Sequence, residues 1–449
     1  MSKRREDRQN TVRPNDTTHV DDLEQQRKAD NQRAVIVGVM PDGDDLSELR
    51  ELLRTAGVEV LEQMVQHRPD PHPNTYVGEG KLVELQQLAA KLGATVVVTD
   101  DELSPRQERN LEGSLNMPVI DRTALILDIF ATHANSAEGK LQVELAQLQY
   151  NLARMRGLWT HLDRLGVGGV GTRGPGETQI ETDRRLARDR ITKLQRKLKE
   201  VKGTRAVMRA ERARSSHIPN VALAGYTNAG KSTVLNALTG SDVGVQDQLF
   251  HTLDPTTREL RQNGRTYLLT DTVGFIRKLP HHLVRAFGAT LEETVIADLL
   301  LHVVDASVPD QQMNAVMAAV DDVLREIGAT QDDGSGRLLV LNKCDLIDDD
   351  RREELRIRFP DAVQIAAGAG VGLDVLAERI EHEFDAMLRP LELLLPYSEG
   401  ATLAELHKLA GDLEQEHRGD GVLVRVRVPR ALAGRYERYR VTPASSPDA

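Results

Sequence analysis

The residues with the clearest chemistry lie at positions 225–233, in the stretch GYTNAGKST. Glycines in such a loop let the backbone wrap closely around a phosphate, and Lys231 reaches the outer phosphates of a nucleotide. Ser232 supplies a hydroxyl ligand for magnesium. An apolar strand pattern precedes the loop and a helical pattern follows it, which is the context that GxxxxGKS requires. The predicted phosphate-binding residues are Gly225, Tyr226, Thr227, Asn228, Ala229, Gly230, Lys231, Ser232 and Thr233.

Two further motifs follow in the order that a guanine-nucleotide switch domain requires. DTVG matches DxxG: Asp271 holds magnesium through water, and the N–H of Gly274 meets the γ-phosphate. NKCD matches NKxD, in which Asp345 accepts two hydrogen bonds from guanine. Adenine offers no such donors, and a carboxylate left unpaired would penalise ATP. The three motifs together predict GTP as the ligand, and the second and third comprise Asp271, Thr272, Val273, Gly274, Asn342, Lys343 and Asp345.

The residue after DTVG bears on the rate of hydrolysis. Ras-like GTPases often carry a glutamine there, which orients the attacking water, whereas this chain has Phe275. An apolar side chain cannot orient water. We therefore expect slow basal hydrolysis of GTP to GDP and phosphate, completed by a partner or an ion.

The composition predicts a soluble protein. The chain has 449 residues, 40% of them hydrophobic, and it contains neither an apolar run long enough to span a membrane nor a signal peptide. We therefore expect a cytoplasmic protein without a membrane span, acting as a monomer. The single cysteine, Cys344, excludes an internal disulfide and a cysteine-based zinc site.

The charge is unevenly distributed. The whole chain carries a formal net charge of -11, with 58 Lys and Arg against 69 Asp and Glu. Residues 136–215, however, contain 18 basic and 9 acidic residues, so this segment is strongly positive. A charged segment can simply be a solvated helix face. The contrast with the acidic remainder favours a contact with a polyanion.

The pattern along the chain predicts an α/β protein in several parts. Strand patterns at 34–40, 58–65 and 95–100 alternate with helical ones, which is typical of a small domain with a largely parallel sheet. A Ras-like P-loop GTPase domain and a small C-terminal α/β module follow later. The predicted parts are a disordered extension 1–33, an N-terminal α/β domain 34–134, a basic helical hairpin 135–215, a GTPase domain 216–389, a C-terminal module 390–441 and a tail 442–449.

The predicted hairpin has a glycine-rich tip. Leu141, Leu145 and Leu148 recur at helical spacing in its first helix, and a second long helix follows the stretch GVGGVGTRGPG at 166–176. We expect the second helix to face the first through Ile180, Leu186, Ile191, Leu194 and Leu198. The six glycines give the tip freedom to approach another surface, and Arg173 suits phosphate. A plain connector is the alternative.

Four stretches, GPGETQIETDRR, GYTNAGKST, FHTLDPTTR and DTVGFI, resemble the HflX family of GTPases, over about residues 34–430. The resemblance implies a GTPase that binds the large ribosomal subunit and its rRNA, and helps to separate or rescue stalled ribosomes, which would stimulate it. It also makes FHTLDPTTR the first switch and Thr252 the second magnesium ligand. The switch residues expected beside the nucleotide are Phe250, His251, Thr252, Leu253 and Asp254.

The resemblance assigns roles to a few more residues. Lys231, Thr252 and Gly274 are the expected catalytic residues. Asn228 would help to bind a potassium ion beside the phosphates, although an asparagine there can also stabilise the loop turn. Ala366 and Ala367 align with the ribose-side loop, where such GTPases usually have a Ser-Ala pair.

Other functions fit parts of the sequence. An RNA-remodelling NTPase would share the P-loop but should show an acidic Walker B pair and an adenine-compatible pocket. A ribosome-binding module without activity would need a broken P-loop, and Lys231 and Ser232 are intact. A GTPase of ribosome assembly stays open as an alternative to splitting or rescue.

Overall fold

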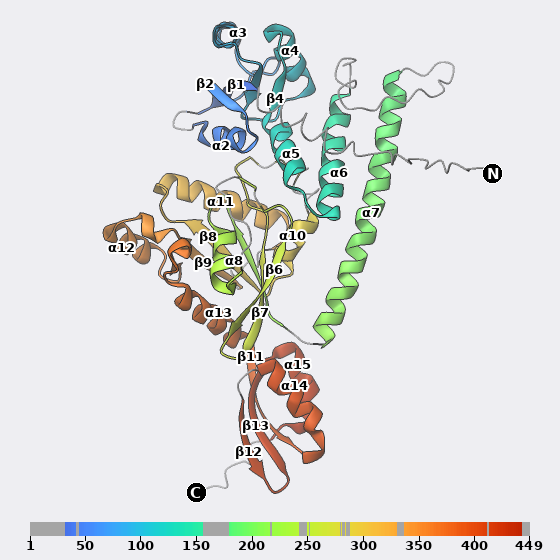
Figure 1. Cartoon of the computed structure of the whole chain (residues 1–449), viewed down its shortest axis with the longest axis vertical. Coiled ribbons are helices and arrows are strands. Elements are labelled where there is room, and N and C mark those ends of the chain that lie inside the picture. Colours follow the sequence, from blue (N-terminus) through green and yellow to red (C-terminus); the bar gives the residue numbers. More distant parts are fainter. Residues whose placement is uncertain are drawn as a thin grey trace, which may run out of the picture. The chain divides into compact units, whose positions relative to one another are not determined.

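The computed structural model (Figure 1) describes residues 32–41, 45–155, 179–215, 218–241, 249–250, 252–278, 280, 283, 288–329, 336–410 and 413–441. The predicted extension up to residue 31, the tip loop 166–176, His251 and the tail 442–449 lie outside these residues. The chain divides into two compact units, Met1–Ile126 and Leu127–Ala449. Among the described helices, none is long and apolar enough to cross a membrane.

The first unit contains a four-stranded sheet in the order β2-β1-β3-β4, with every pairing parallel. Its central strand β1 is buried from its second residue onward, which explains its continuous apolar run. The parallel α/β architecture predicted for this region is confirmed. The elements are β1 (Arg33–Met40), α2 (Ser47–Thr55), β2 (Glu59–His67), α3 (Glu79–Leu92), β3 (Val96–Thr99), α4 (Pro105–Leu115) and β4 (Val119–Asp121).

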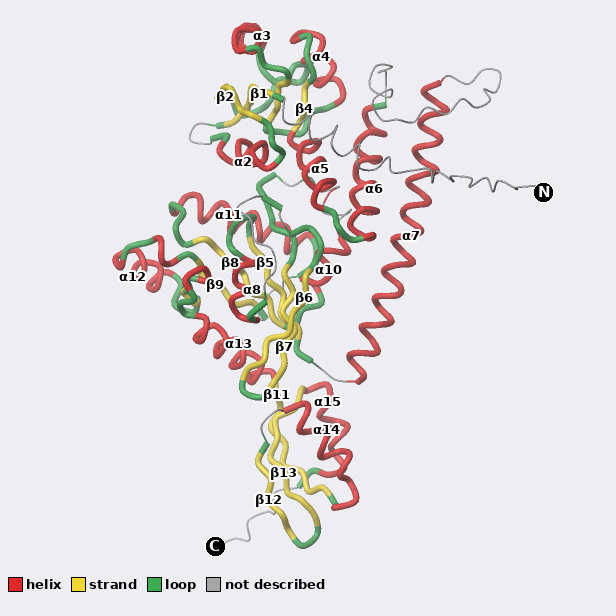
Figure 2. Tube along the Cα trace, viewed as in Figure 1, coloured by secondary structure: helices red, strands yellow, loops and turns green. Residues whose placement is uncertain are grey.

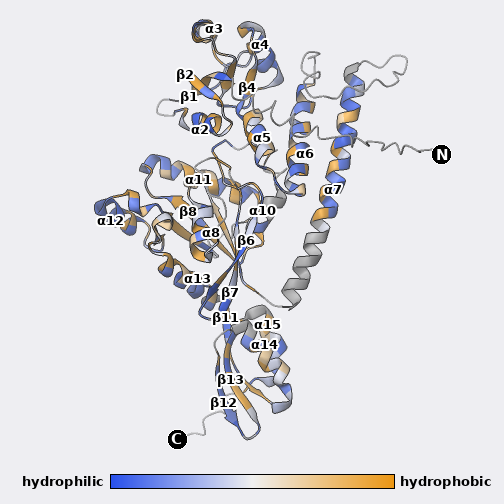
Figure 3. Ribbon diagram, viewed as in Figure 1, coloured by the Kyte–Doolittle hydropathy of each residue, from blue (hydrophilic) through white to orange (hydrophobic). Residues whose placement is uncertain are grey.

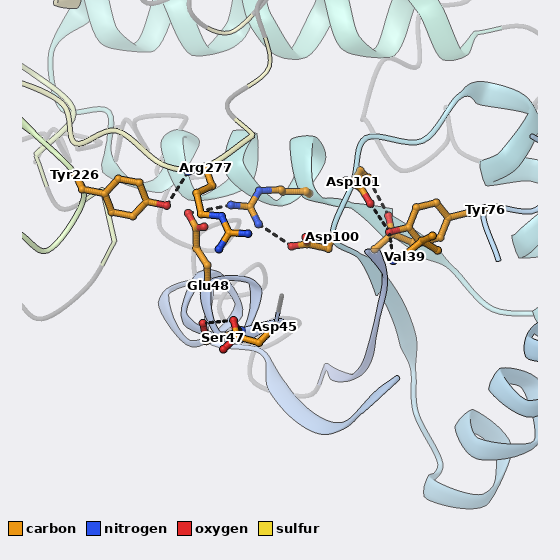
Figure 4. A network of polar contacts seen from close by, with 11 residues as sticks. Val39, Asp45, Ser47, Glu48, Tyr76, Asp100, Asp101, Tyr226 and Arg277 are labelled. Atoms are coloured by element: carbon orange, nitrogen blue, oxygen red, sulfur yellow. Dashed lines mark hydrogen bonds and ion pairs between the residues drawn. The ribbon is translucent and has the colours of Figure 1, made fainter. Parts of the chain in front are cut away.

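Buried polar groups tie the ends of these strands to the helices. Arg122 is 3% exposed and lies between Glu48 and Asp100, with N–O distances of 2.9 and 2.8 Å. The Tyr76 hydroxyl donates to Asp101 at 2.6 Å, as Figure 4 shows. Because an unpaired buried charge is costly, these contacts specify one arrangement of α2 against the sheet.

The helix α5 (Arg122–His133) was not predicted. Its sequence, RTALILDIFATH, is apolar at consecutive positions and has no stripe at helical spacing. Leu125, Ile126, Leu127, Ile129 and Phe130 are all buried. A helix that is apolar on most sides shows no amphipathic period, so sequence periodicity could not identify it.

Helix α6 (Ala137–Arg154) packs against the long helix α7 (Gln179–Ser215), and Figure 1 shows the two side by side. Leu145, Leu194 and Leu198 form the buried contact, with three predicted neighbours, Leu141, Leu148 and Ile191, around it. The prediction for Leu186 is wrong, because its side chain is 55% exposed. Ala187, which is 6% exposed, takes the buried position instead. Figure 3 colours most residues in the described part of α7 as hydrophilic, with hydrophobic residues between them.

The next sheet has six strands in the order β10-β9-β8-β5-β7-β6, and only β6 runs antiparallel to its neighbour. Figure 2 shows these strands together in the middle of the chain, with helices around them. The elements are β5 (Asn220–Gly225), α8 (Lys231–Thr239), β6 (Thr256–Gln262), β7 (Arg265–Asp271), α10 (Gly288–Val295), β8 (Leu299–Asp305), α11 (Asp310–Glu326), β9 (Arg337–Asn342), α12 (Asp349–Arg358), β10 (Val363–Gln364) and α13 (Leu373–Met387).

This sheet positions the predicted motifs. Strands β5, β7 and β9 end at Gly225, Asp271 and Asn342, where the three motifs begin. Because these strands point the same way, their carboxyl ends meet at one edge. Apolar residues from β5, β7, β8 and β9 form the core beneath that edge.

The C-terminal part is a three-stranded antiparallel sheet in the order β11-β13-β12. Leu391, Leu393 and Leu395 of β11 pack with alternate valines of β13 in its core. The outer strand β12 has the sequence EQEHR, and all five residues are exposed. The elements are β11 (Leu388–Leu395), η4 (Tyr397–Glu399), α14 (Gly400–Ala410), β12 (Glu414–Arg418), β13 (Gly421–Pro429), α15 (Arg430–Tyr436) and η5 (Glu437–Tyr439).

Candidate nucleotide-binding site

The side chain of Lys231 is hydrogen-bonded to the backbone of the loop between β5 and α8. Lys231 is 7% exposed, and its Nζ donates hydrogen bonds to the carbonyl oxygens of Gly225 at 3.2 Å and Tyr226 at 2.9 Å. Burial lowers the pKa of Lys231 to about 8, with nearby Asp271 opposing the shift. The ammonium group therefore lies inside the loop that the sequence predicts to surround the phosphates.

Three residues from separate motifs meet beside this loop. The Ser232 hydroxyl donates to Asp271 Oδ2 at 2.5 Å and lies 3.0 Å from the hydroxyl of Thr252. Asp271 Oδ1 is buried and has no hydrogen-bond partner among the described residues. Burial raises the pKa of Asp271, whereas Lys231 and Ser232 act in the opposite direction. Two hydroxyls beside an unsatisfied carboxylate oxygen form the all-oxygen set that suits magnesium.

The DxxG segment packs directly on the P-loop. The N–H of Thr227 donates to the carbonyl oxygen of Phe275 at 2.8 Å, and the N–H of Phe275 donates to that of Gly225 at 3.1 Å. The Tyr226 hydroxyl accepts a hydrogen bond from the N–H of Arg277 at 2.7 Å (Figure 4). The sequence predicts none of these three hydrogen bonds, because each depends on how two distant loops approach each other.

The glycine of DxxG is required sterically. A Cβ at Gly274 would lie 2.7 Å from Cγ2 and 2.9 Å from Cα of Thr227, and 3.0 Å from Nζ of Lys231. The neighbouring Thr272 is fully buried, and its hydroxyl donates to the carbonyl oxygen of Leu223 at 2.7 Å. Val273 is also buried. The side chains of these two residues are therefore used for packing, and a contact of either residue with a nucleotide stays a prediction.

The NKCD motif braces several loops. The buried Asn342 donates from Nδ2 to the carbonyl oxygen of Ala229 at 2.9 Å, and its Oδ1 accepts from the N–H of Ala367 at 3.0 Å. Lys343 pairs with Asp305 at 2.7 Å. Asp345 is exposed in the short helix η2 (Cys344–Leu346), and its predicted contact with guanine stays a prediction.

The expected ribose-side loop is compact. Ala366 and Val371 exchange two backbone hydrogen bonds, of 3.0 and 3.1 Å, around the short helix η3 (Ala367–Ala369). Ala366 and Ala367 are both buried, and the backbone of Ala367 is fixed by Asn342. A contact between this loop and a ribose stays a prediction.

The remaining predicted residues vary in exposure. Asn228 is exposed and has a left-handed backbone conformation, with φ of 61°. Phe250 and Leu253 of the predicted first switch are buried, at 3% and 2% exposure. Asp254 of the same switch contacts Asn135 and Ser136, which the sequence did not indicate.

Three family models match consecutive parts of the chain. Residues 43–131 match the family model for the N-terminal region of GTP-binding GTPases, residues 133–212 match its middle region, and residues 220–343 match a model described as a 50S ribosome-binding GTPase. One solved structure, a GTP-binding protein from the archaeon Sulfolobus solfataricus in complex with GDP, is 25% identical with a TM-score of 0.40, covering 78% of this chain and 98% of its own.

Curated relatives resemble almost the whole chain. GTPase HflX of Lacrimispora saccharolytica is 46% identical over 408 residues, which are 89% of this chain and 94% of the relative. GTPase HflX of Escherichia coli is 45% identical over 410 residues, again 89% of this chain and 94% of the relative. Identity at this level over this length, together with a complete set of P-loop, DxxG and NKxD residues, shows that the chain belongs to the HflX family of GTPases.

Proposed function

We propose that this GTPase binds the large ribosomal subunit through its basic hairpin, residues 135–215, and uses GTP to split or rescue ribosomes in the cytoplasm. The observation that carries the proposal is the exposed cationic surface of α7. Five of its cations are exposed and have no ion pair within the described part of the chain: Arg188, Lys193, Arg196, Lys197 and Lys199. Such a surface suits the phosphate backbone of rRNA.

The match of residues 220–343 to a model described as a 50S ribosome-binding GTPase supports the same partner. The pairing of α6 with α7 also supports it, because it holds the cations on a defined surface. Arg190 pairs with Glu144 of α6 at 2.5 Å and therefore braces the two helices. The tip loop 166–176 lies outside the described residues, so its insertion into rRNA stays a prediction.

We infer that Ser232 and Thr252 hold magnesium directly and that Asp271 holds it through water. The hydroxyl pair and the unsatisfied Oδ1 of Asp271 support this assignment. When bound, the ion would neutralise charge on the β- and γ-phosphates. Lys231 would add a positive charge from within the loop, and the N–H of Gly274 would donate to the γ-phosphate.

Slow basal turnover follows from Phe275. Its side chain is fully buried and apolar, so it cannot orient the attacking water. Asn228, at its exposed left-handed position, is our candidate for binding a potassium ion beside the phosphates. We propose that hydrolysis is accelerated when the ribosome supplies or orders the missing group.

Sedimentation with separated ribosomal subunits tests the partner. The wild-type protein should sediment with large subunits in the presence of a non-hydrolysable GTP analogue, and less so with GDP. Reversing Lys193, Lys197 and Lys199 to glutamate should weaken this binding and reduce its salt dependence, while GTP affinity stays unchanged. Reversing three cations elsewhere, Arg261, Arg325 and Arg356, is the matched control. Equal sedimentation of both triple variants would show that α7 is not the rRNA contact.

A further inference from the structure

The first switch is anchored on both sides of Thr252. Two residues before it, the Phe250 ring packs edge to face on Phe130 of α5, with ring centroids 4.6 Å apart and planes at 78°. Two residues after it, Asp254 reaches the start of α6. Thr252 itself lies 3.0 Å from Ser232. Its hydroxyl can therefore shift little without disturbing one of these two contacts.

The contact of Asp254 consists of three hydrogen bonds. Its Oδ2 accepts from the backbone N–H groups of Asn135 at 3.0 Å and Ser136 at 2.7 Å, and its Oδ1 accepts from the Ser136 hydroxyl. Ser136 is also the N-cap of α6, where its Oγ accepts from the N–H of Gly139 at 2.8 Å. The carboxylate thus shares the cap of this helix, and hydrogen bonds to a charged acceptor are among the stronger ones.

The close approach requires a glycine in the first turn of α6. A Cβ at Gly139 would lie 2.5 Å from Asp254 Oδ1 and 3.1 Å from the Ser136 hydroxyl. Glycine costs stability within a helix relative to alanine. Its presence here is explained by the space that the switch carboxylate occupies.

We infer that Asp254, Ser136 and Gly139 form a switch latch that holds Thr252 in its magnesium-binding position and couples that position to the helical hairpin. The inference rests on the proposed role of Thr252 as a magnesium ligand. Switch segments of GTPases are ordered by contacts to the γ-phosphate and magnesium, and are released after hydrolysis. Here the ordered switch completes the cap of α6, so release of the switch removes three hydrogen bonds from the base of the hairpin.

The coupling acts in both directions. Helix α6 is packed on α7 through Leu145, Leu194 and Leu198, so a change at its first turn is carried by a rigid pair of helices. A ligand that fixes the hairpin in its latched position must, by linkage, raise the affinity for GTP over GDP. Asp254 is accordingly a positioning residue, since it acts through Thr252.

Nucleotide affinities test the latch. In Asp254→Ala we expect the Kd for a non-hydrolysable GTP analogue with magnesium to rise about tenfold or more, and the Kd for GDP to change by less than about twofold. Gly139→Ala should give the same pattern because its methyl group displaces the carboxylate. The double variant Asp254→Ala/Gly139→Ala should have the same Kd values for the GTP analogue and GDP as Asp254→Ala alone. Helix α4 provides matched controls: Ser104→Ala removes a comparable N-cap and Gly113→Ala adds a methyl group in open space.

Hydrogen exchange of the peptide covering residues 133–142 gives a direct readout. Its amides should exchange more slowly with the GTP analogue than with GDP, and Asp254→Ala should abolish that difference. Thr252→Ala separates the two proposals. If Thr252→Ala loses the preference for the triphosphate and Asp254→Ala and Gly139→Ala keep it, the latch is wrong. If Thr252→Ala also keeps the preference, its magnesium role is wrong and the latch falls with it.

Discussion

We predict that the lowered pKa of Lys231 makes nucleotide affinity depend on pH. In the structure the pKa is lowered to about 8, because the ammonium group is buried in the P-loop. The phosphates of a bound nucleotide favour the charged form and must raise this pKa again. Below pH 8 the lysine is already protonated, so binding has no proton to take up. Above pH 8 it must first gain one, and affinity falls.

The size of the effect follows from the pKa. Relative to neutral pH, affinity should fall roughly twofold at pH 8 and roughly tenfold at pH 9, with about one proton taken up per nucleotide at the higher pH. Titrations with fluorescent GDP between pH 6.5 and 9.5 measure the affinity. Calorimetry in buffers of different ionisation enthalpy measures the number of protons taken up.

A lysine-specific control is needed, because the guanine base and the phosphates also titrate. Lys231→Arg keeps a positive charge at every pH in this range, so it should bind more weakly but lose the extra fall above pH 8. If the wild type and Lys231→Arg had parallel pH profiles, the lysine would be fully charged in the free protein. The explanation based on burial would then be refuted.

Three further changes have clear expectations. Gly274→Ala should slow single-turnover hydrolysis at least tenfold, because the backbone of Thr227 cannot move away from the new methyl group; an unchanged rate would contradict this packing. Asn342→Ala should weaken GDP and GTP binding by similar factors, since Ala229 and Ala367 both lose a partner, and a loss confined to GTP in the same titrations would argue against a brace. GTP turnover should be faster in potassium than in sodium salts, and Asn228→Ala should reduce the difference. Equal rates in both salts would exclude a role for potassium in hydrolysis.

The sequence predicts the chemistry of the site, and the structure brings Ser232, Thr252 and Asp271 of that prediction together. GxxxxGKS, DxxG and NKxD each have a fixed spacing that suits phosphate, magnesium or guanine, so roles could be predicted individually for Ser232, Asp271 and Asp345. The parallel sheets were also predictable, because strand and helix patterns alternate clearly. Helix α5 was not, since a helix apolar on most sides has no period to detect.

Contacts between distant loops were beyond the sequence. Asp254 and Ser136 are 118 positions apart, and neither residue type is unusual in its own segment. Asn342 could be assigned to a motif, yet its two braces depend on the positions of three loops. Leu186 had the right residue type at almost the right spacing, and the choice of Ala187 instead was decided by the rotation of α7 on α6.

The outer strand β12 affects how the protein behaves at high concentration. In the described part of the chain it is an edge strand of its sheet, and a flat apolar strand in that place would invite strands of other molecules to add to the sheet. Instead the sequence EQEHR places charged or polar groups at every position, all exposed. Each additional strand would have to bring its own side chains against these charges. We therefore expect replacement of Glu414 and Glu416 by valine to promote aggregation while leaving nucleotide binding intact.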